Sequence, residues 1–124
     1  MKSNSPFPSP TQHTHSLKSE VIAVYGETAE SRMMYRAPFP VSPREAAEIM
    51  EAALAYADGG YNAFEPKLLL KLPADAQVIL AREYSVCVYV TVNPLFAGKD
   101  ALQRKMEADE CDFQEDGTLR LWWD

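Results

Sequence analysis

The chain is short of the residues and motifs on which most enzymes depend. Only two of its 124 residues are histidines, His13 and His15, and both lie in a segment rich in proline and serine. A Ser-His-Asp or Cys-His site needs a histidine held by the fold, so either kind of site is disfavoured. The five glycines form no phosphate-binding or dinucleotide-binding loop. We therefore expect no enzyme, although carboxylate-pair chemistry stays open because acidic residues are plentiful.

Cysteine and long apolar runs are scarce as well. The two cysteines, Cys87 and Cys111, are fewer than small secreted domains usually carry. We expect free thiols, with a disulfide between them as the alternative. No apolar run reaches the roughly 18 residues of a membrane-spanning helix. The N-terminus also lacks the apolar stretch of a secretory signal, which favours the cytoplasm.

Two candidate metal sites fail on their ligands. His13 and His15 supply two imidazoles, which is no closed ligand set for structural zinc. A calcium loop that begins at Asp112 and places Gly117 at its glycine position would put Trp123 where a bidentate glutamate is required. We therefore expect no metal ion and no cofactor.

Length and composition indicate one folded domain with an N-terminal arm. The chain is 47% hydrophobic and 24% charged, which is too apolar for full disorder and short enough for a single domain. Residues 1–19 contain three prolines, five serines and few large apolar side chains. We predict a disordered or loosely attached arm over residues 1–19 and a single domain over residues 20–124.

The first half of this domain is predicted to hold two strands and a helix. Residues 21–25 are β-branched and aromatic, and residues 32–37 form a weaker apolar stretch, so a hairpin between two strands is expected. Ser42 and Glu45 form a capping box with a proline at the first helical position. Apolar residues then recur at helical spacing, which predicts a helix over residues 43–58.

The second half is predicted to be mainly strands. Residues 67–72 are apolar, but the run is too short for periodicity to separate strand from helix. Residues 77–82 and 85–92 are expected to pair as a hairpin, and the second strand is apolar on both faces, which is typical of a central position. Residues 100–110 indicate a peripheral helix, and residues 118–123 a last strand.

These elements together predict an α+β fold. Strands outnumber helices, and most of them are joined by short loops. This order favours a single domain built on a mainly antiparallel sheet of four or five strands, with two helices packed on it.

Negative charge is concentrated at the C-terminal end. Residues 100–124 hold eight acids and three bases, against ten acids and nine bases in residues 1–99. Residues 107–116 contain six acids and no base, namely Glu107, Asp109, Glu110, Asp112, Glu115 and Asp116. Their mutual repulsion destabilises the fold unless a cation or a basic partner relieves it. Free nucleic acid is an unfavourable partner for a chain of net charge −6, because its phosphates would be repelled.

Two adjacent tryptophans end the last strand. Trp122 and Trp123 must point to opposite faces, so one can enter the core while the other is covered or exposed. Tryptophan is enriched in binding hot spots. We therefore predict a partner-binding site made of the six acids with Trp122 and Trp123. Solvation of the acids and internal packing of Trp122 are the alternative.

These features favour a small acidic protein-binding module. Its concrete form is an inhibitor that occludes the basic nucleic-acid site of a larger enzyme, as an anti-defence protein of a phage or mobile element would, in the manner of an anti-CRISPR. The alternatives are an accessory or immunity-type subunit, or a homodimeric structural protein that pairs edge strands. A further alternative is a small-ligand domain or enzyme whose pocket is lined by Tyr25, Tyr35, Tyr61, Tyr84 and Tyr89.

Overall fold

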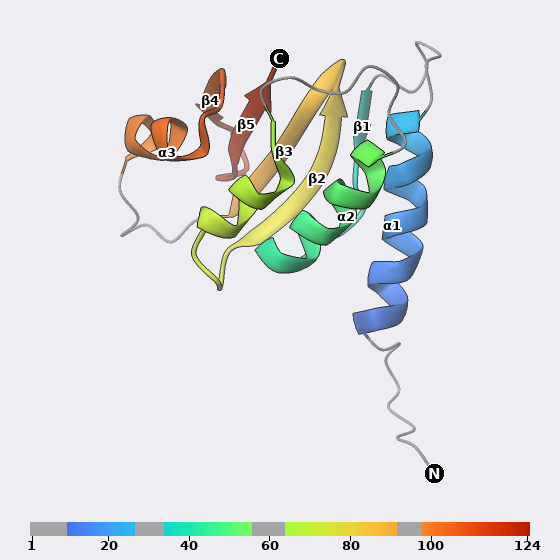
Figure 1. The fold of residues 1–124 in the computed structure, drawn as a ribbon. Coiled ribbons are helices and arrows are strands. Elements are labelled where there is room, and N and C mark those ends of the chain that lie inside the picture. Colours follow the sequence, from blue (N-terminus) through green and yellow to red (C-terminus); the bar gives the residue numbers. More distant parts are fainter. Residues whose placement is uncertain (1–9, 27–33, 56–63, 92–97) are drawn as a thin grey trace.

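A computed structural model describes residues 10–26, 34–55, 64–91 and 98–124, without the side chains of residues 10–14. The elements follow in the order α1 (Pro10–Gly26), β1 (Met34–Arg36), α2 (Pro43–Ala55), the 3-10 helix η2 (Pro66–Lys71), β2 (Gln77–Glu83), β3 (Ser85–Thr91), α3 (Lys99–Met106), β4 (Glu110–Phe113) and β5 (Leu119–Trp123). The strands form one antiparallel sheet in the order β1-β2-β3-β5-β4 (Figure 1). The predicted α+β fold is confirmed.

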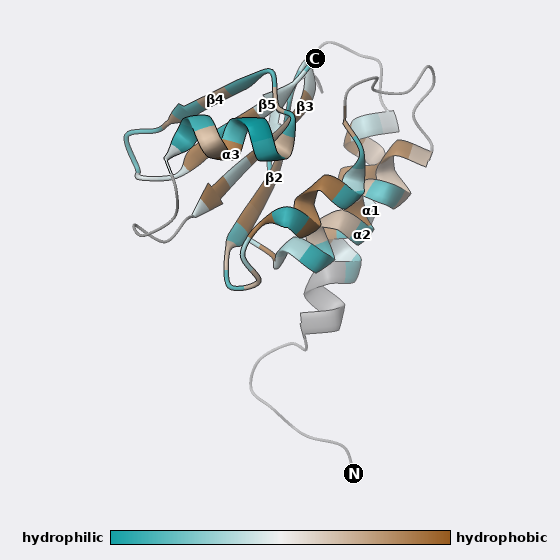
Figure 2. Cartoon of the chain, turned by 60° about the vertical axis from the view of Figure 1, so that its left-hand side comes forward, coloured by the Kyte–Doolittle hydropathy of each residue, from teal (hydrophilic) through white to brown (hydrophobic). Residues whose placement is uncertain are grey.

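The two long helices cover one face of this sheet. In Figure 1, α2 lies in front of the strands, α1 lies beside α2 at the edge of the sheet near β1, and α3 lies apart from both near β4. The strands and α2 carry most of the apolar colour in Figure 2, whereas α3 and the β4–β5 turn are largely hydrophilic. The face with α1 and α2 is called here the helix face, and the opposite one the open face.

The hydrophobic core lies between the sheet and the helices. Its strand residues alternate along the chain and are almost completely buried: Val78, Leu80, Val86, Val88, Val90, Leu119, Leu121 and Trp123. The helices contribute Leu17, Val21, Val24, Ala46, Ile49, Met50 and Ala53. Burial of this apolar surface is the main contribution to the stability of the fold.

Several local predictions are confirmed. The Ser42 hydroxyl accepts a hydrogen bond from the Glu45 amide, and the Glu45 carboxylate accepts one from the Ser42 amide, each at 3.1 Å. This capping box begins α2, while residues 56–58 of the predicted helix lie outside the described residues. β2 and β3 form the predicted hairpin, and β3 is the central strand of the sheet.

The prediction of a strand over residues 21–25 is wrong, because these residues belong to α1. Leu17, Val21 and Val24 are buried at the three- and four-residue spacing of one helix face. The arm boundary at residue 19 is also wrong, since α1 begins at Pro10; residues 1–9 lie outside the described residues. β1 consequently pairs with β2 and not with residues 21–25.

The helix predicted over residues 100–110 is shorter than expected. Glu107 adopts a left-handed conformation with φ of 55°, and its amide donates to the carbonyls of the last helical turn, which ends α3. The chain then turns back, and residues 110–113 pair with β5 as an edge strand that the sequence did not predict. The open question over residues 67–72 is resolved as the short helix η2.

The burial of Leu17 provides a test of whether α1 belongs to the folded domain. Leu17→Ala is expected to lower the free energy of unfolding by about 2–4 kcal/mol, because it leaves a cavity between α1 and α2. Ser19→Ala, at an exposed position of the same helix, is expected to change it by less than about 0.5 kcal/mol. Urea unfolding curves measure both values, and equal values for the two variants would show that α1 is a loose arm.

Candidate functional site

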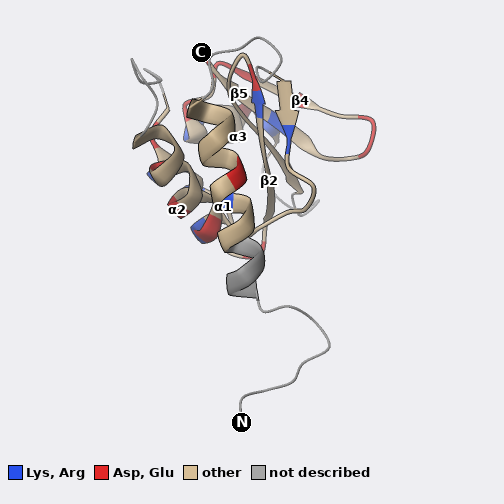
Figure 3. Cartoon of the chain, turned by 90° about the vertical axis from the view of Figure 1, so that its right-hand side faces the viewer, with Lys and Arg blue, Asp and Glu red and all other residues tan. Residues whose placement is uncertain are grey.

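The six acids of residues 107–116 all lie on the surface. They lie along the edge strand β4 and in the segments directly before and after it. Each of the six residues is exposed. Glu110 and Asp112 lie on β4, Glu107 ends α3, and Glu115 and Asp116 lie in the β4–β5 turn. Figure 3 shows this turn in red, on the side of the sheet away from α1 and α2. These six residues are called here the acidic surface.

Arg120 of β5 lies against the acids of β4. Its guanidinium is 2.9 Å from the Glu110 carboxylate and 3.5 Å from the Asp112 carboxylate. The strand register explains these contacts, because Asp112 is directly opposite Arg120 on the neighbouring strand. The repulsion expected within the acidic run is therefore relieved in part by a cation of the chain itself.

Two other cations reach the flanks of the acidic surface from distant elements. Lys71 of η2 is 3.7 Å from Glu107, and Arg36 of β1 is 3.2 Å from Asp116. Hydrogen bonds from Thr118, followed by the contact with Arg36, lower the pKa of Asp116. Even if all three cations are counted in full, six acids and three bases leave the acidic surface with a net charge of −3.

A second group of polar side chains lies on the open face around Glu83. The Glu83 carboxylate accepts a hydrogen bond from Arg120 Nε at 2.9 Å and lies 2.8 Å from Arg120 Nη2 in an ion pair. It also accepts a hydrogen bond from the Tyr89 hydroxyl. The Cys87 thiol lies 3.5 Å from the same carboxylate. These four residues are called here the Glu83 cluster. They come from β2, β3 and β5, and alternation along the strands turns them all to the open face.

The environment of the Glu83 cluster fixes the protonation state of its members. Burial raises the pKa of Glu83, but hydrogen bonds from Arg120 and Tyr89 outweigh it, so the pKa lies below its ordinary value. Burial and the Glu83 carboxylate raise the pKa values of Cys87 and Tyr89. At neutral pH the carboxylate is charged while the thiol and the phenol keep their protons. The Cys87 thiol is therefore a poor nucleophile, because the thiolate is the reactive form.

The two tryptophans have different environments. Trp123 is fully buried on the helix face, where its indole N–H donates to the Met106 carbonyl and its ring meets Phe64 edge-on. The prediction that Trp123 binds a partner is therefore wrong, because no surface of it remains accessible. Trp122 lies half-buried on the open face, and its indole N–H donates to the Glu83 carbonyl at 2.8 Å. Trp122 remains a candidate binding residue.

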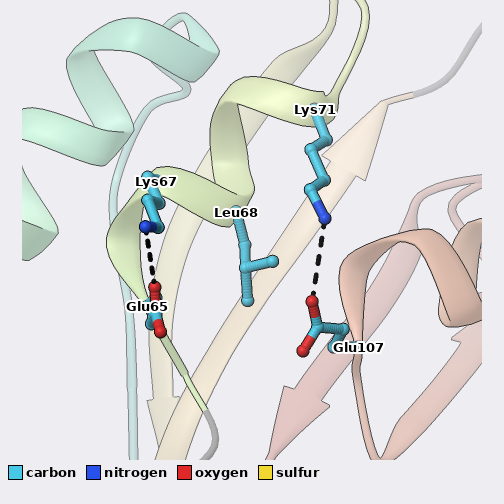
Figure 4. A pocket seen from close by; sticks show the side chains of 5 residues that line it. All are labelled: Glu65, Lys67, Leu68, Lys71 and Glu107. Carbon is cyan, nitrogen blue, oxygen red and sulfur yellow. Dashed lines mark ion pairs between the residues drawn. The ribbon is translucent and has the colours of Figure 1, made fainter.

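A small pocket opens between η2 and the end of α3. Its volume is about 240 Å³, and it is lined by Glu65, Lys67, Leu68, Lys71 and Glu107. Figure 4 shows that each lysine faces a glutamate, with Lys67 3.3 Å from Glu65 and Lys71 3.7 Å from Glu107. The lining is thus neutral in sum, so the pocket offers no excess charge to a ligand.

The tyrosines predicted to line a pocket are spread over the molecule. Tyr25 is buried in the last turn of α1, and its hydroxyl donates to the Ala81 carbonyl of β2. Tyr35 donates to Glu20 of α1, whereas Tyr89 lies on the open face and Tyr84 is exposed at the β2–β3 turn. Tyr61 lies outside the described residues. Those in the described part of the chain therefore line no common pocket.

The two cysteines are free, as predicted. Cys87 is opposite Trp122 on the open face, whereas Cys111 is opposite Leu121 on the helix face, so the sheet separates the two thiols. Within the described ranges, no three His, Cys, Asp or Glu side chains come together as metal ligands. In the same ranges, no helix combines the length and the apolar character needed to cross a membrane.

Comparisons with known proteins give no match. No family model, no curated protein and no solved structure matches the chain significantly. The functional argument therefore depends on the geometry of the chain alone.

The sequence prediction missed the Glu83 cluster. The hairpin predicted from residues 77–82 and 85–92 leaves Glu83 in the connection between its strands, and it places Cys87 and Tyr89 on an apolar face of the second strand. The alternation of Arg120 with leucines along the last strand was the one available signal, because it places a cation on the face that Cys87 and Tyr89 share. That Glu83 is the partner of Arg120 depends on the order of the strands in the sheet, and local sequence patterns do not reveal that order.

The charge on Glu83 predicts a pH-dependent contribution to stability. The pKa of Glu83 is lower in the folded protein than its ordinary value of 4.5. The stabilisation by the Glu83 carboxylate is therefore fully present above pH 4.5, and it is lost as the pH falls through the pKa of the folded state. We expect Glu83→Gln to be less stable than wild type by about 1–3 kcal/mol near neutral pH. The gap should close on acidification, as wild-type Glu83 is protonated. Urea midpoints across that range measure the gap, and a gap independent of pH would contradict the predicted ion pair.

The raised pKa of Cys87 predicts a slow reaction with thiol reagents. In a Cys111→Ser variant, which leaves Cys87 as the single thiol, alkylation by iodoacetamide at neutral pH is expected to be on the order of 100-fold slower in the folded protein than in urea. Mass spectrometry over time gives both rates. A folded-state rate equal to the unfolded one would identify an activated thiol and revive the enzyme hypothesis.

Proposed function

We propose that the protein is a protein-binding module that docks its acidic surface on a basic surface of a larger partner. The observation that carries this proposal is the net charge of −3 that remains on the acidic surface after its three cations, Arg36, Lys71 and Arg120, are counted. Within the described residues, this edge thus holds more carboxylates than the cations in contact with it neutralise. A basic partner would complete the compensation, with fast association that weakens as salt rises.

The concrete form of the proposal is an inhibitor of a nucleic-acid-processing enzyme. Sites for nucleic acid are lined by Lys and Arg that contact phosphates, so an acidic surface competes for the same side chains. The mechanism would be occlusion, in which the bound domain blocks the entry of DNA or RNA without turnover. This fits an anti-defence protein that acts in the cytoplasm, and the free thiols of Cys87 and Cys111 are in keeping with a reducing compartment.

Charge on β4 bears on the homodimer alternative. Antiparallel pairing of two β4 edges would bring Glu110 and Asp112 of one copy beside the same residues of the other, which is destabilising. The other edge strand, β1, has only three residues. An accessory or immunity-type subunit would use the same acidic surface and differ in its partner, so partner identification separates it from the inhibitor.

Two variants with the same change in charge test the proposal. Glu110→Gln, Asp112→Asn and Glu115→Gln together remove three charges from the acidic surface. The control removes three exposed charges elsewhere, through Glu48→Gln, Glu51→Gln and Asp75→Asn. In a pull-down from nuclease-treated bacterial lysate, we expect wild type and control to capture the same basic nucleic-acid enzyme. The acidic-surface variant should bind the purified enzyme at least about tenfold more weakly.

A functional assay completes this test. Wild-type protein should inhibit the captured enzyme in proportion to occupancy, and duplex DNA in excess should displace it. Equal binding by both variants would place the interface elsewhere. An enzyme that keeps its full activity while bound would contradict occlusion.

A further inference from the structure

Three large side chains with apolar surface are grouped around Glu83, at the end of the open face where β2 turns into β3. Met34 of β1 is directly opposite Glu83 and is 57% exposed. Tyr84 follows Glu83 in the β2–β3 turn and is 67% exposed. Trp122 of β5 reaches across β3 to donate to the Glu83 carbonyl. Met34, Tyr84 and Trp122 are called here the apolar patch.

Tyr84 has an unfavourable backbone conformation as well as an exposed side chain. Its φ of 66° lies in the left-handed region, where glycine or asparagine is the usual residue of a tight turn. A tyrosine there costs stability and contributes little burial in return. Residues that combine strain with exposure are concentrated at binding sites, and tyrosine, tryptophan and methionine are enriched at the centres of protein interfaces.

The strand register places the apolar patch beside the acidic surface. Glu110 is directly opposite Trp122 on the neighbouring strand, so both side chains lie on the open face. Asp112 follows on the same face, opposite Arg120. A partner that covers Trp122 therefore also meets the carboxylates of β4.

We infer that the apolar patch and the β4 carboxylates form one docking surface, and that its occupant is a protein segment with an apolar side chain beside Lys or Arg. The inference rests on the proposed function and adds the chemistry that gives it specificity. The carboxylates at Glu110 and Asp112 attract the basic side chains, and Met34, Tyr84 and Trp122 take the apolar one. The opposite charges raise the rate of association, and burial of the apolar side chains lowers the rate of dissociation.

Phe113 supplies a matched control. It is 60% exposed, close to the value for Tyr84, and it lies on β4 among the same acids. It is opposite the buried core residue Leu119, however, and thus belongs to the helix face. A general effect of exposed aromatic surface would make Phe113 and Tyr84 equivalent. Docking around Glu83 makes only Tyr84 important, because Tyr84 directly follows Glu83 in the β2–β3 turn.

Two peptides of equal positive charge serve as probes, one with alternating Lys and Leu and one with alternating Lys and Ser. Binding is followed by NMR titration of the amide and indole N–H signals. We expect the Lys–Leu peptide to bind about tenfold more tightly than the Lys–Ser peptide. It should shift the signals of Met34, Tyr84 and the Trp122 indole. Tyr84→Ser should abolish the difference between the peptides, and Phe113→Ser should preserve it.

The outcomes separate this inference from the proposed function. Equal affinity for both peptides, with shifts confined to the acidic surface, would overturn the apolar patch and leave the acidic docking proposal standing. Lys–Leu binding that survives Glu110→Gln with Asp112→Asn and that does not depend on salt would overturn the composite surface, because the acids would take no part. No binding of either peptide at low salt would contradict both proposals.

Discussion

The fold depends on burial of the central strand β3 on both of its faces, although the described helices lie on only one. On the helix face, Val86, Val88 and Val90 are completely buried in the core cluster that also contains residues of α1, α2 and η2. On the open face, Cys87 is also completely buried, and it packs in a small cluster with Ala81, Tyr89 and Trp122. Long side chains from neighbouring strands thus shield the open face of β3 from solvent, as the helices shield the other face.

The Glu83 cluster explains how those long side chains are held flat on the sheet. Arg120 contacts Glu83 on one side and the β4 acids on the other, so one guanidinium links β2, β5 and β4. Arg36 of β1 stacks on the Tyr89 ring at 4.3 Å and extends to Asp116 in the β4–β5 turn. The open face is consequently crossed by two arginines. They stabilise the sheet and partly neutralise the acidic surface, which connects the stability of the fold to the charge available for docking.

Local patterns were sufficient where the interactions they describe are local. The capping box at Ser42, the β2–β3 hairpin and the alternation of β5 all involve residues close in sequence, and each is found in the structure. Residues 21–25 show the limit of this approach. β-branched residues favour strands only weakly, and packing of Leu17, Val21 and Val24 beside α2 makes the segment helical. The helical spacing was present in the sequence but was divided by the boundary placed at residue 19.

The sequence by itself determined the α+β class, the apolar faces of the central strand and the accumulation of acids near the C-terminus, because composition and short-range periodicity contain them. Only the tertiary structure decided that residues 110–113 form an edge strand, since Cys111 and its neighbours gain a partner only when β5 lies beside them. The same holds for Lys71, Arg36 and Arg120, which reach the acids from three separate elements. Ion pairs between residues far apart in the chain depend on how strands are ordered, and strand order is a property of the packed sheet.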